Sequence, residues 1–166
     1  NTPQSGFMTK IARSPAAYAV VAMLAIAGCS KKNALPDNAN QLGLNGVAAG
    51  STQDFTVNVG DRVFFETDSS IITAQGQATL NKQATWLQRY PDYSIQIEGH
   101  ADERGTRAYN LALGARRAAA VRSYLSARGV AANKMSTISY GKERPVAVCN
   151  DISCWSQNRR GVTVLR

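Results

Sequence analysis

The segment from residue 95 to residue 125 constrains the fold more than any other part of this 166-residue chain. Ile95 and Ile97 alternate with polar residues, which predicts a strand with one buried face. Two glycines then bracket a turn, and apolar residues at helical spacing follow it. Because a strand, a short turn and a helix follow one another, Asp102 in the turn can lie beside Arg117 in the helix.

A carboxylate beside a guanidinium offers opposite charges to a single ligand. Asp102 and Arg117 would therefore suit a zwitterion that carries both an ammonium and a carboxylate group. Such a site can bind without catalysing a reaction. The alternative is an internal ion pair on a solvated surface, which composition alone favours.

The rest of the chain predicts an α+β fold with a β-α-β-α-β order and one further strand ahead of it. Residues 67–70 supply capping side chains for the first helix, and Pro91 ends it. A mixed sheet with both helices packed on one face is the expected arrangement. The strand ahead of this order is predicted at 55–59. The other strands are predicted at 62–65, at 94–99 and, completing the order, at 135–140 and 161–165, and the helices at about 71–89 and 107–128.

The N-terminal segment has the pattern of an export signal. Lys10 and Arg13 precede an apolar run over residues 16–27, and small residues follow around Cys29. The run is short for a membrane span. We expect residues 1–28 to comprise an upstream extension and a lipoprotein signal peptide, although a short buried helix with an incidental cysteine is the alternative.

Residues 26–29 resemble a bacterial lipobox, in which the cysteine is acylated and becomes the new N-terminus. Cys29 is therefore predicted to carry the lipid, and Ser30 after it indicates an outer-membrane location facing the periplasm. Each buried methylene contributes about 0.8 kcal/mol, so several acyl chains would make the attachment essentially permanent. Residues 29–53 lack sustained periodicity and predict a flexible tether, and residues 54–166 predict the folded domain.

The two remaining cysteines, Cys149 and Cys154, enclose four residues. In an oxidising compartment they are expected to form a disulfide, with free thiols or a metal site as the alternatives. The metal alternative is weak because the only histidine, His100, does not complete a four-ligand set with them. We expect neither a metal nor another cofactor.

The net charge is +8, and removal of residues 1–28 leaves 17 basic and 11 acidic residues, or +6. Strong basicity often marks nucleic-acid binding. An exported, lipidated chain meets little nucleic acid, so cell-wall carboxylates or a protein partner fit the charge better. Basicity alone does not choose between these partners.

A series of short motifs spans the C-terminal half of the chain. In this order and spacing they resemble the OmpA-like peptidoglycan-binding domain family, over about residue 61 to the C-terminus. The motifs are GHADERG at 99–105, YN at 109–110, LG at 113–114, RRA at 116–118, SYGKE at 139–143 and NRR at 158–160.

The resemblance implies that Asp102 and Arg117 bind meso-diaminopimelate in the peptidoglycan stem peptide. Asp102 would take the ammonium group and Arg117 the carboxylate. Lysine at that position of the stem lacks the carboxylate. Because charge-assisted hydrogen bonds contribute about 1.5–3 kcal/mol, discrimination of about tenfold or more is expected.

Five further residues are expected near the ligand. Asp68 and Ser69 resemble the strand-end loop that borders the family's pocket, and Asn110 would fix the loop or contact the stem peptide. Thr106 would cap the second helix. Arg159 would line the pocket or brace the fold.

The resemblance further implies TolB and other Tol proteins as partners, together with a role in envelope integrity and cell division. An outer-membrane lipoprotein that ties the membrane to the wall is therefore the leading hypothesis. A metal-assisted peptidoglycan amidase that uses His100 is the enzymatic alternative, although His100 is more readily explained as a structural hydrogen-bonding residue. A lipoprotein that binds anions nonspecifically through its basic surface is the third hypothesis.

Overall fold

The computed structural model describes residues 46–166, so the predicted signal peptide, Cys29 and most of the predicted tether lie outside the described residues. The packed part of the chain begins before the predicted domain start at Asp54. Val47 is buried, and the Tyr93 hydroxyl donates a hydrogen bond to the carbonyl of Gly50 (2.9 Å). Within residues 46–166, no helix is both long and apolar enough to cross a bilayer.

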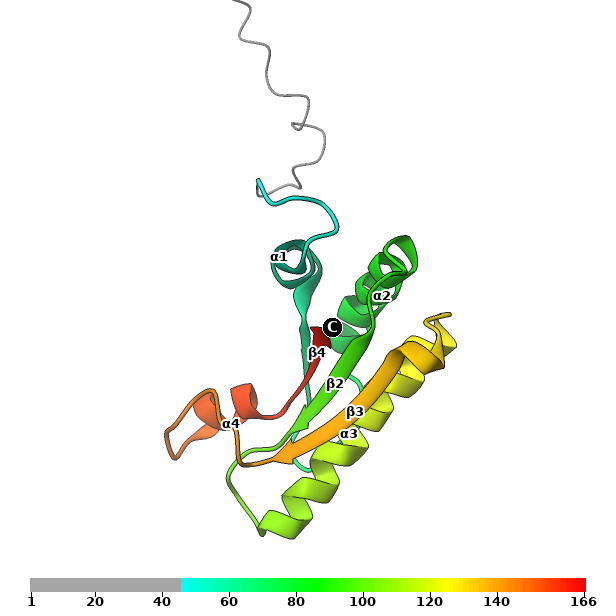
Figure 1. Ribbon diagram of the computed structural model, residues 1–166. Helices are drawn as coiled ribbons and strands as arrows, with labels where there is room; N and C mark the ends of the chain where they lie inside the picture. Colours follow the sequence, from blue (N-terminus) through cyan, green and yellow to red (C-terminus); the bar gives the residue numbers. More distant parts are fainter. Residues whose placement is uncertain (1–45) are drawn as a thin grey trace, which may run out of the picture. The chain divides into compact units, whose positions relative to one another are not determined.

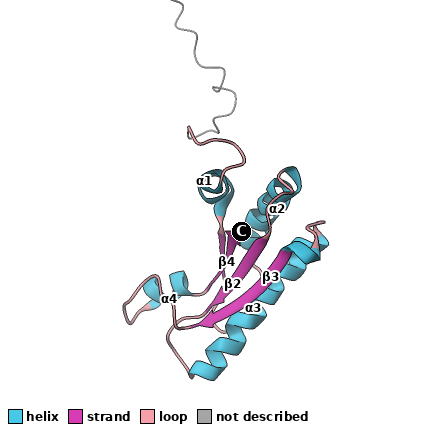
Figure 2. Ribbon diagram, viewed as in Figure 1, coloured by secondary structure: helices cyan, strands magenta, loops and turns pink. Residues whose placement is uncertain are grey.

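Helices and strands alternate along the described chain (Figure 1). Two long helices accompany a small sheet, and short helical segments occupy the connections (Figure 2). The elements are α1 (Thr52–Asp54), the π-helix η2 (Phe55–Gly60), β1 (Arg62–Phe64), α2 (Ala74–Arg89), β2 (Ile95–His100), α3 (Arg107–Ala127), the 3-10 helix η3 (Ala132–Lys134), β3 (Met135–Gly141), α4 (Ile152–Asn158) and β4 (Arg160–Leu165).

The four strands form one mixed sheet in the order β1-β4-β2-β3. Strand β4 runs antiparallel to both β1 and β2, whereas β2 and β3 are parallel. The register between β2 and β3 shifts between Gly99 and His100. This irregularity lies at the end of β2, where the chain turns toward Asp102. The predicted mixed sheet is confirmed.

Helices α2 and α3 cover one face of the sheet. Ile97 of β2 is fully buried, and Gly161 of β4 lies against Val121 of α3. The Thr163 hydroxyl of β4 donates a hydrogen bond to Gln83 of α2 (2.9 Å). The predicted α+β class with both helices on one face is therefore confirmed. The core comprises Phe55, Val63, Phe65, Leu80, Ala84, Trp86, Leu87, Ile95, Ile97, Ala118, Val121, Leu125, Val130 and Met135.

The backbones of α3 and β2 approach each other closely at Gly99 and Gly114. A β-carbon added to Gly99 would overlap the carbonyl of Gly114, and one added to Gly114 would lie 2.8 Å from the carbonyl oxygen of Gly99. Gly99, the last residue of the predicted strand at 94–99, lies inside β2. Its role is to let the helix that carries Arg117 approach the strand.

The predicted strand at residues 55–59 is wrong, because these residues form η2. Phe55, Val57 and Val59 are spaced two apart, as the buried residues of a strand are. Phe55 and Val59 are also four apart, and residues at that spacing lie on one side of a helix. Phe55 is buried, whereas Val57 is 52% exposed. The apolar residues that suggested a strand therefore include a helical i, i+4 pair, Phe55 and Val59.

The first long helix, α2, begins later than predicted. Its N-cap is Thr73, whose side chain accepts a hydrogen bond from the amide of Gly76 (3.1 Å), so residues 67–70 do not cap it. Ser69 instead accepts a hydrogen bond from the amide of Ile71 (3.0 Å) and forms a local turn. Serine and aspartate favour such turns as readily as helix caps.

Helix α4 was not predicted. Asp151 caps it and accepts a hydrogen bond from the amide of Ser153 (2.8 Å). The expected disulfide between Cys149 and Cys154 is present, with α-carbons 5.6 Å apart. The cap and the disulfide both lie in the connection between β3 and β4, which Figure 1 shows at the same end of the sheet as the loop from β2 to α3.

Candidate functional site

Asp102 lies in the loop between β2 and α3, where it is buried and faces a cavity of about 240 Å³. The loop after β1 supplies the opposite wall. Of the predicted site residues, Asp68, Asp102 and Asn110 line this cavity. The complete lining is Thr67, Asp68, Asp102, Arg104, Gly105, Tyr109, Asn110 and Leu113.

The carboxylate of Asp102 forms ion pairs with two arginines. Arg104 grips both oxygens, with Nε 3.0 Å from Oδ1 and Nη2 2.7 Å from Oδ2. Arg159 Nη1 lies 3.5 Å from Oδ2. Burial raises the pKa of Asp102, but the hydrogen bonds and charge of Arg104, with the charge of Arg159, outweigh burial and hold the pKa below its ordinary value. Asp102 is therefore ionised at neutral pH.

Arg117 is fully buried in α3 and donates to three backbone carbonyls. Nε bonds Ser69 (2.8 Å), Nη1 bonds His100 (2.8 Å) and Nη2 bonds Glu66 (3.0 Å). Burial, followed by the charge of Arg159, lowers the pKa of Arg117 to about 10, so it remains charged at neutral pH. A guanidinium has five N–H donors, so these three bonds leave two N–H groups for other acceptors.

Asp102 and Arg117 thus lie at the same end of β2, but at different depths. Asp102 lines the cavity, whereas Arg117 does not and is tied to the backbone on both sides of it. The internal ion pair considered from sequence is replaced by the pairs of Asp102 with Arg104 and Arg159.

Asp68 and Tyr109 join the two walls of the cavity. Asp68 has a left-handed backbone (φ 53°), and the Tyr109 hydroxyl donates a hydrogen bond to its carboxylate. Left-handed backbone is uncommon for residues other than glycine, and aspartate tolerates it better than most. The bond therefore connects the loop after β1 to the first turn of α3.

The other expected residues mainly support the site. Thr106 caps α3 as predicted, accepting a hydrogen bond from the amide of Tyr109 (3.2 Å). Asn110 fixes the loop by donating to the carbonyl of Arg104 (2.7 Å). Arg159 braces the fold by donating to the carbonyl of Phe65 (2.9 Å). Ser69 contributes its carbonyl to Arg117, as described above.

His100 is 1% exposed and sits between two charged neighbours. Its Nε2 lies 3.3 Å from Glu98 Oε2, and its Nδ1 lies 3.4 Å from Arg160 Nη2. The Glu98 carboxylate favours a protonated ring. Burial, followed by the positive charges of Arg160, Arg144 and Arg62, lowers the pKa of His100 to about 4. His100 is therefore a neutral, structural residue at neutral pH.

Several cavity residues were not singled out from the sequence, and they include Arg104, Tyr109 and Leu113. Arg104 could have been noticed, because it is the third charged residue of the same short motif as Asp102. Nothing in the sequence connected Trp155 to the site. Its ring lies under the Arg104 guanidinium, with 4.0 Å between the guanidinium carbon and the ring centroid.

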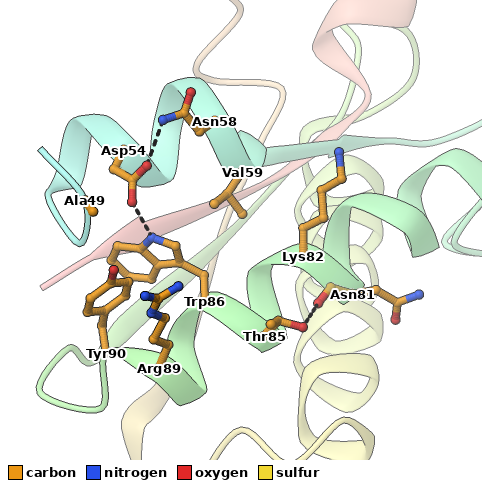
Figure 3. Close-up of a pocket in the computed structure, with 10 residues that line it drawn as sticks. All are labelled: Ala49, Asp54, Asn58, Val59, Asn81, Lys82, Thr85, Trp86, Arg89 and Tyr90. Carbon is orange, nitrogen blue, oxygen red and sulfur yellow. Dashed lines mark hydrogen bonds between the residues drawn. The ribbon is translucent and has the colours of Figure 1, made fainter. Parts of the chain in front are cut away.

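A larger cavity of about 530 Å³ lies between η2 and α2, lined by none of the predicted site residues. Figure 3 shows Trp86 at its wall, where the indole donates a hydrogen bond to the carboxylate of Asp54 (2.8 Å). Asp54 also accepts hydrogen bonds from Asn58 (2.8 Å) and from the amide of Gly50 (2.9 Å). These bonds make Asp54 the polar centre that fastens the N-terminal segment to α2.

The sequence pattern of the OmpA family matches residues 64–159, which include Asp102 and Arg117. The chain belongs to the OmpA family. Two relatives within it are peptidoglycan-associated lipoproteins. The one from Rhizobium meliloti strain 1021 is 66% identical over 167 residues, covering 99% of this chain and 95% of the relative. The one from Brucella melitensis is 69% identical over 157 residues, covering 93% of this chain and 94% of the relative.

Solved structures show the same fold. The peptidoglycan-associated lipoprotein from Burkholderia pseudomallei is 42% identical with a TM-score of 0.66, over 70% of this chain and all of that chain (100%). The C-terminal domain of Helicobacter pylori MotB is 26% identical with a TM-score of 0.60, over 64% of this chain and 84% of that chain. The family resemblance inferred from the motifs is therefore confirmed, and the chain is similar to peptidoglycan-associated lipoproteins over nearly its whole length.

Proposed function

We propose that this protein is an outer-membrane lipoprotein that binds peptidoglycan non-covalently and so tethers the outer membrane to the cell wall. The observation that carries the proposal is the position of Asp102. Its carboxylate lines a cavity at the end of β2, where α3 also holds the guanidinium of Arg117. The names of the relatives described above support peptidoglycan as the ligand and a lipid anchor, which we place at Cys29.

The ligand proposed for the cavity is the side-chain end of meso-diaminopimelate in the stem peptide. Its ammonium group would pair with Asp102. Its carboxylate would approach the buried Arg117 and accept hydrogen bonds from the two N–H groups that the backbone bonds of Arg117 leave over. The cavity of about 240 Å³ suits the end of one amino-acid side chain rather than a whole stem peptide. Loss of the carboxylate, as in lysine, would weaken binding by about tenfold or more.

The amidase alternative is less well supported by the geometry. His100 would have to reach a wall substrate, but its side chain is buried and faces Glu98 and Arg160. Among residues 46–166, no group of three or more histidine, cysteine, aspartate or glutamate side chains is arranged to hold a metal ion. Binding is therefore the function that the described residues favour.

The wider role proposed is membership of the Tol-Pal system, with TolB and other Tol proteins as periplasmic partners. This part of the proposal rests on the resemblance to the family. A protein fixed to the membrane at Cys29 and to the wall at Asp102 would couple the two layers during envelope constriction and cell division.

The proposal is tested by Asp102→Asn in a pulldown with sacculi of the diaminopimelate type. We expect the fraction bound to fall by about tenfold or more, because the variant keeps the shape of the side chain but loses its charge. Asp92→Asn is the matched control, since it removes one carboxylate at an exposed position outside the cavity. Circular dichroism would confirm that both variants are folded.

Full binding by a folded Asp102→Asn protein would rule out this site. Repeating the pulldown at high salt distinguishes binding at this site from nonspecific attraction of the basic surface to anions. Attraction between exposed charges weakens steeply as ionic strength rises. Arg117→Ala is a poorer test. It removes three hydrogen bonds from a buried side chain and is expected to lower stability, which would confuse loss of binding with loss of fold.

A further inference from the structure

In this structure the carboxylate of Asp102 already forms an ion pair with a side chain of the protein itself, that of Arg104. Arg104 contacts the carboxylate with Nε (3.0 Å), with Nη2 (2.7 Å) and with its backbone amide (3.2 Å). Arg159 approaches the same group to 3.5 Å. A carboxylate has about four acceptor positions, so an incoming ammonium group has to displace one of these donors.

Arg104 is the donor that can leave. Its side chain is 41% exposed, whereas that of Arg159 is 5% exposed and is anchored to the carbonyl of Phe65. One face of the Arg104 guanidinium stacks on Trp155, and the indole of Trp155 donates a hydrogen bond to Glu103. Arg104 can therefore leave Asp102 by rotating its own side chain, with no change in the sheet or in α3.

We propose that Arg104 is a specificity-determining residue, which exchanges partners when a zwitterionic ligand enters the cavity. This inference rests on the proposed function. The ammonium group of the ligand would replace Arg104 on Asp102, and the released guanidinium would join Arg117 on the ligand carboxylate. The pair between Asp102 and Arg104 that binding breaks is thus replaced by two pairs, one to each charge of the ligand, so the exchange is favourable for a ligand that carries both charges.

A ligand with an ammonium group alone receives no such compensation. A lysine side chain would break the pair between Asp102 and Arg104 and form one pair in its place, leaving Arg104 without a carboxylate. The internal pair therefore selects against lysine-type stems. Arg117 does not perform this exchange, because it is fully buried and bonded to three backbone carbonyls.

The test compares two soluble stem tripeptides, one ending in meso-diaminopimelate and the other in lysine, by isothermal titration calorimetry on the full chain in detergent. The wild type is expected to prefer the diaminopimelate peptide by about tenfold or more. In Arg104→Gln we expect the lysine peptide to bind about three- to tenfold more tightly, because Asp102 is no longer occupied. The preference should shrink accordingly.

Arg107→Gln is the matched control, since it removes an arginine that pairs with Glu143 outside the cavity. It should leave the preference unchanged. An unchanged preference in Arg104→Gln, with binding still lost in Asp102→Asn, would overturn the role of Arg104 and leave the proposed function standing. Failure of the wild type to bind either peptide would overturn both.

Fluorescence gives a second readout, because the exchange moves Arg104 off the Trp155 ring. Saturating diaminopimelate peptide is expected to change the tryptophan emission of the wild type. The change should be absent in Trp155→Phe, which retains only the buried Trp86. Identical responses in the two proteins would show that Arg104 stays in place and would overturn the exchange.

Discussion

Three arginines lie near Asp102, and different contacts hold each of them in place. Arg117 donates hydrogen bonds to backbone carbonyls. Arg104 pairs with Asp102 and stacks on Trp155, and Arg159 donates a hydrogen bond to the carbonyl of Phe65. Within residues 46–166, Arg159 Nη1 is buried without a hydrogen-bond partner, and it lies 3.5 Å from Asp102 Oδ2. Asp102 therefore has a structural task as well as a proposed binding task, since it compensates a buried positive charge.

The buried imidazole of His100 makes stability depend on pH. Its pKa is lowered to about 4 in the folded protein, compared with an ordinary value of 6.5. Below pH 6.5 the unfolded chain therefore binds a proton that the folded chain does not, and stability falls as the pH drops from 6.5 toward 4. We expect a loss of about 2 kcal/mol between pH 7 and pH 5, measured by urea unfolding.

His100→Gln supplies the control for this prediction. The variant is expected to be less stable than the wild type at pH 7, but it should lose much less stability between pH 7 and pH 5. If the stability of the variant fell as steeply between pH 7 and pH 5, titratable groups other than His100 would be responsible. The carboxylates of Asp54 and Asp102 do not interfere, because their lowered pKa values place their effect below this range.

At the scale of elements, the contact between β2 and α3 positions both halves of the site. Gly99 and Gly114 let the two backbones meet, and this places Arg117 within reach of the carbonyl of His100. Glycine inside a helix normally costs about 1 kcal/mol relative to alanine. At position 114 the packing of α3 against β2 outweighs this loss of helix stability, because any larger residue would push the helix away from the strand.

Gly114→Ala is therefore expected to destabilise the protein by about 1–3 kcal/mol, against the usual effect of alanine in a helix. The added methyl group would crowd Ser139 and the carbonyl of Gly99. Thermal or urea unfolding measures the change. Ser123→Ala, at an exposed position of the same helix, is the control and should leave stability within about 0.5 kcal/mol. A Gly114→Ala protein as stable as the wild type would contradict the close contact.

Long elements with clear ends were predictable from the sequence. Helix α3 runs from its cap at Thr106 to Gly129, whose left-handed backbone (φ 91°) and bond to Ser126 (3.0 Å) end the helix. The errors fell on short segments. Five residues at 55–59 satisfied both strand and helix spacing, and α4 is too short to show periodicity.

The position of the candidate site in the fold was more predictable than its contacts. Motif order singled out Asp102 and Arg117, and the structure brings them to one end of β2. Sequence spacing does not show the depth of a side chain. The burial of Arg117 and the occupation of Asp102 by Arg104 depend on loops that meet only in the folded chain, so neither could be predicted.

At the scale of the whole molecule, the proposed function requires attachment at both ends of the tether. Cys29→Ser is expected to move the protein from the membrane fraction to the soluble fraction, because it removes the acyl chains that make attachment permanent. Cell fractionation followed by immunoblotting measures this. Ser30→Ala retains Cys29 and is the control for changes near the cleavage site. Membrane attachment of the Cys29→Ser protein at the wild-type level would contradict the lipid anchor.

The disulfide in the connection between β3 and β4 affects how the protein responds to reductants. Cys149 and Cys154 are only five positions apart, so the bridge closes a small ring and stabilises the fold by about 2 kcal/mol at most through chain entropy. Helix α4 begins inside this ring at Ile152, and Trp155 directly follows Cys154. Reduction would therefore loosen the aromatic platform under Arg104 while sparing the sheet, which would make the preference among wall chemistries sensitive to the thiol balance of the envelope.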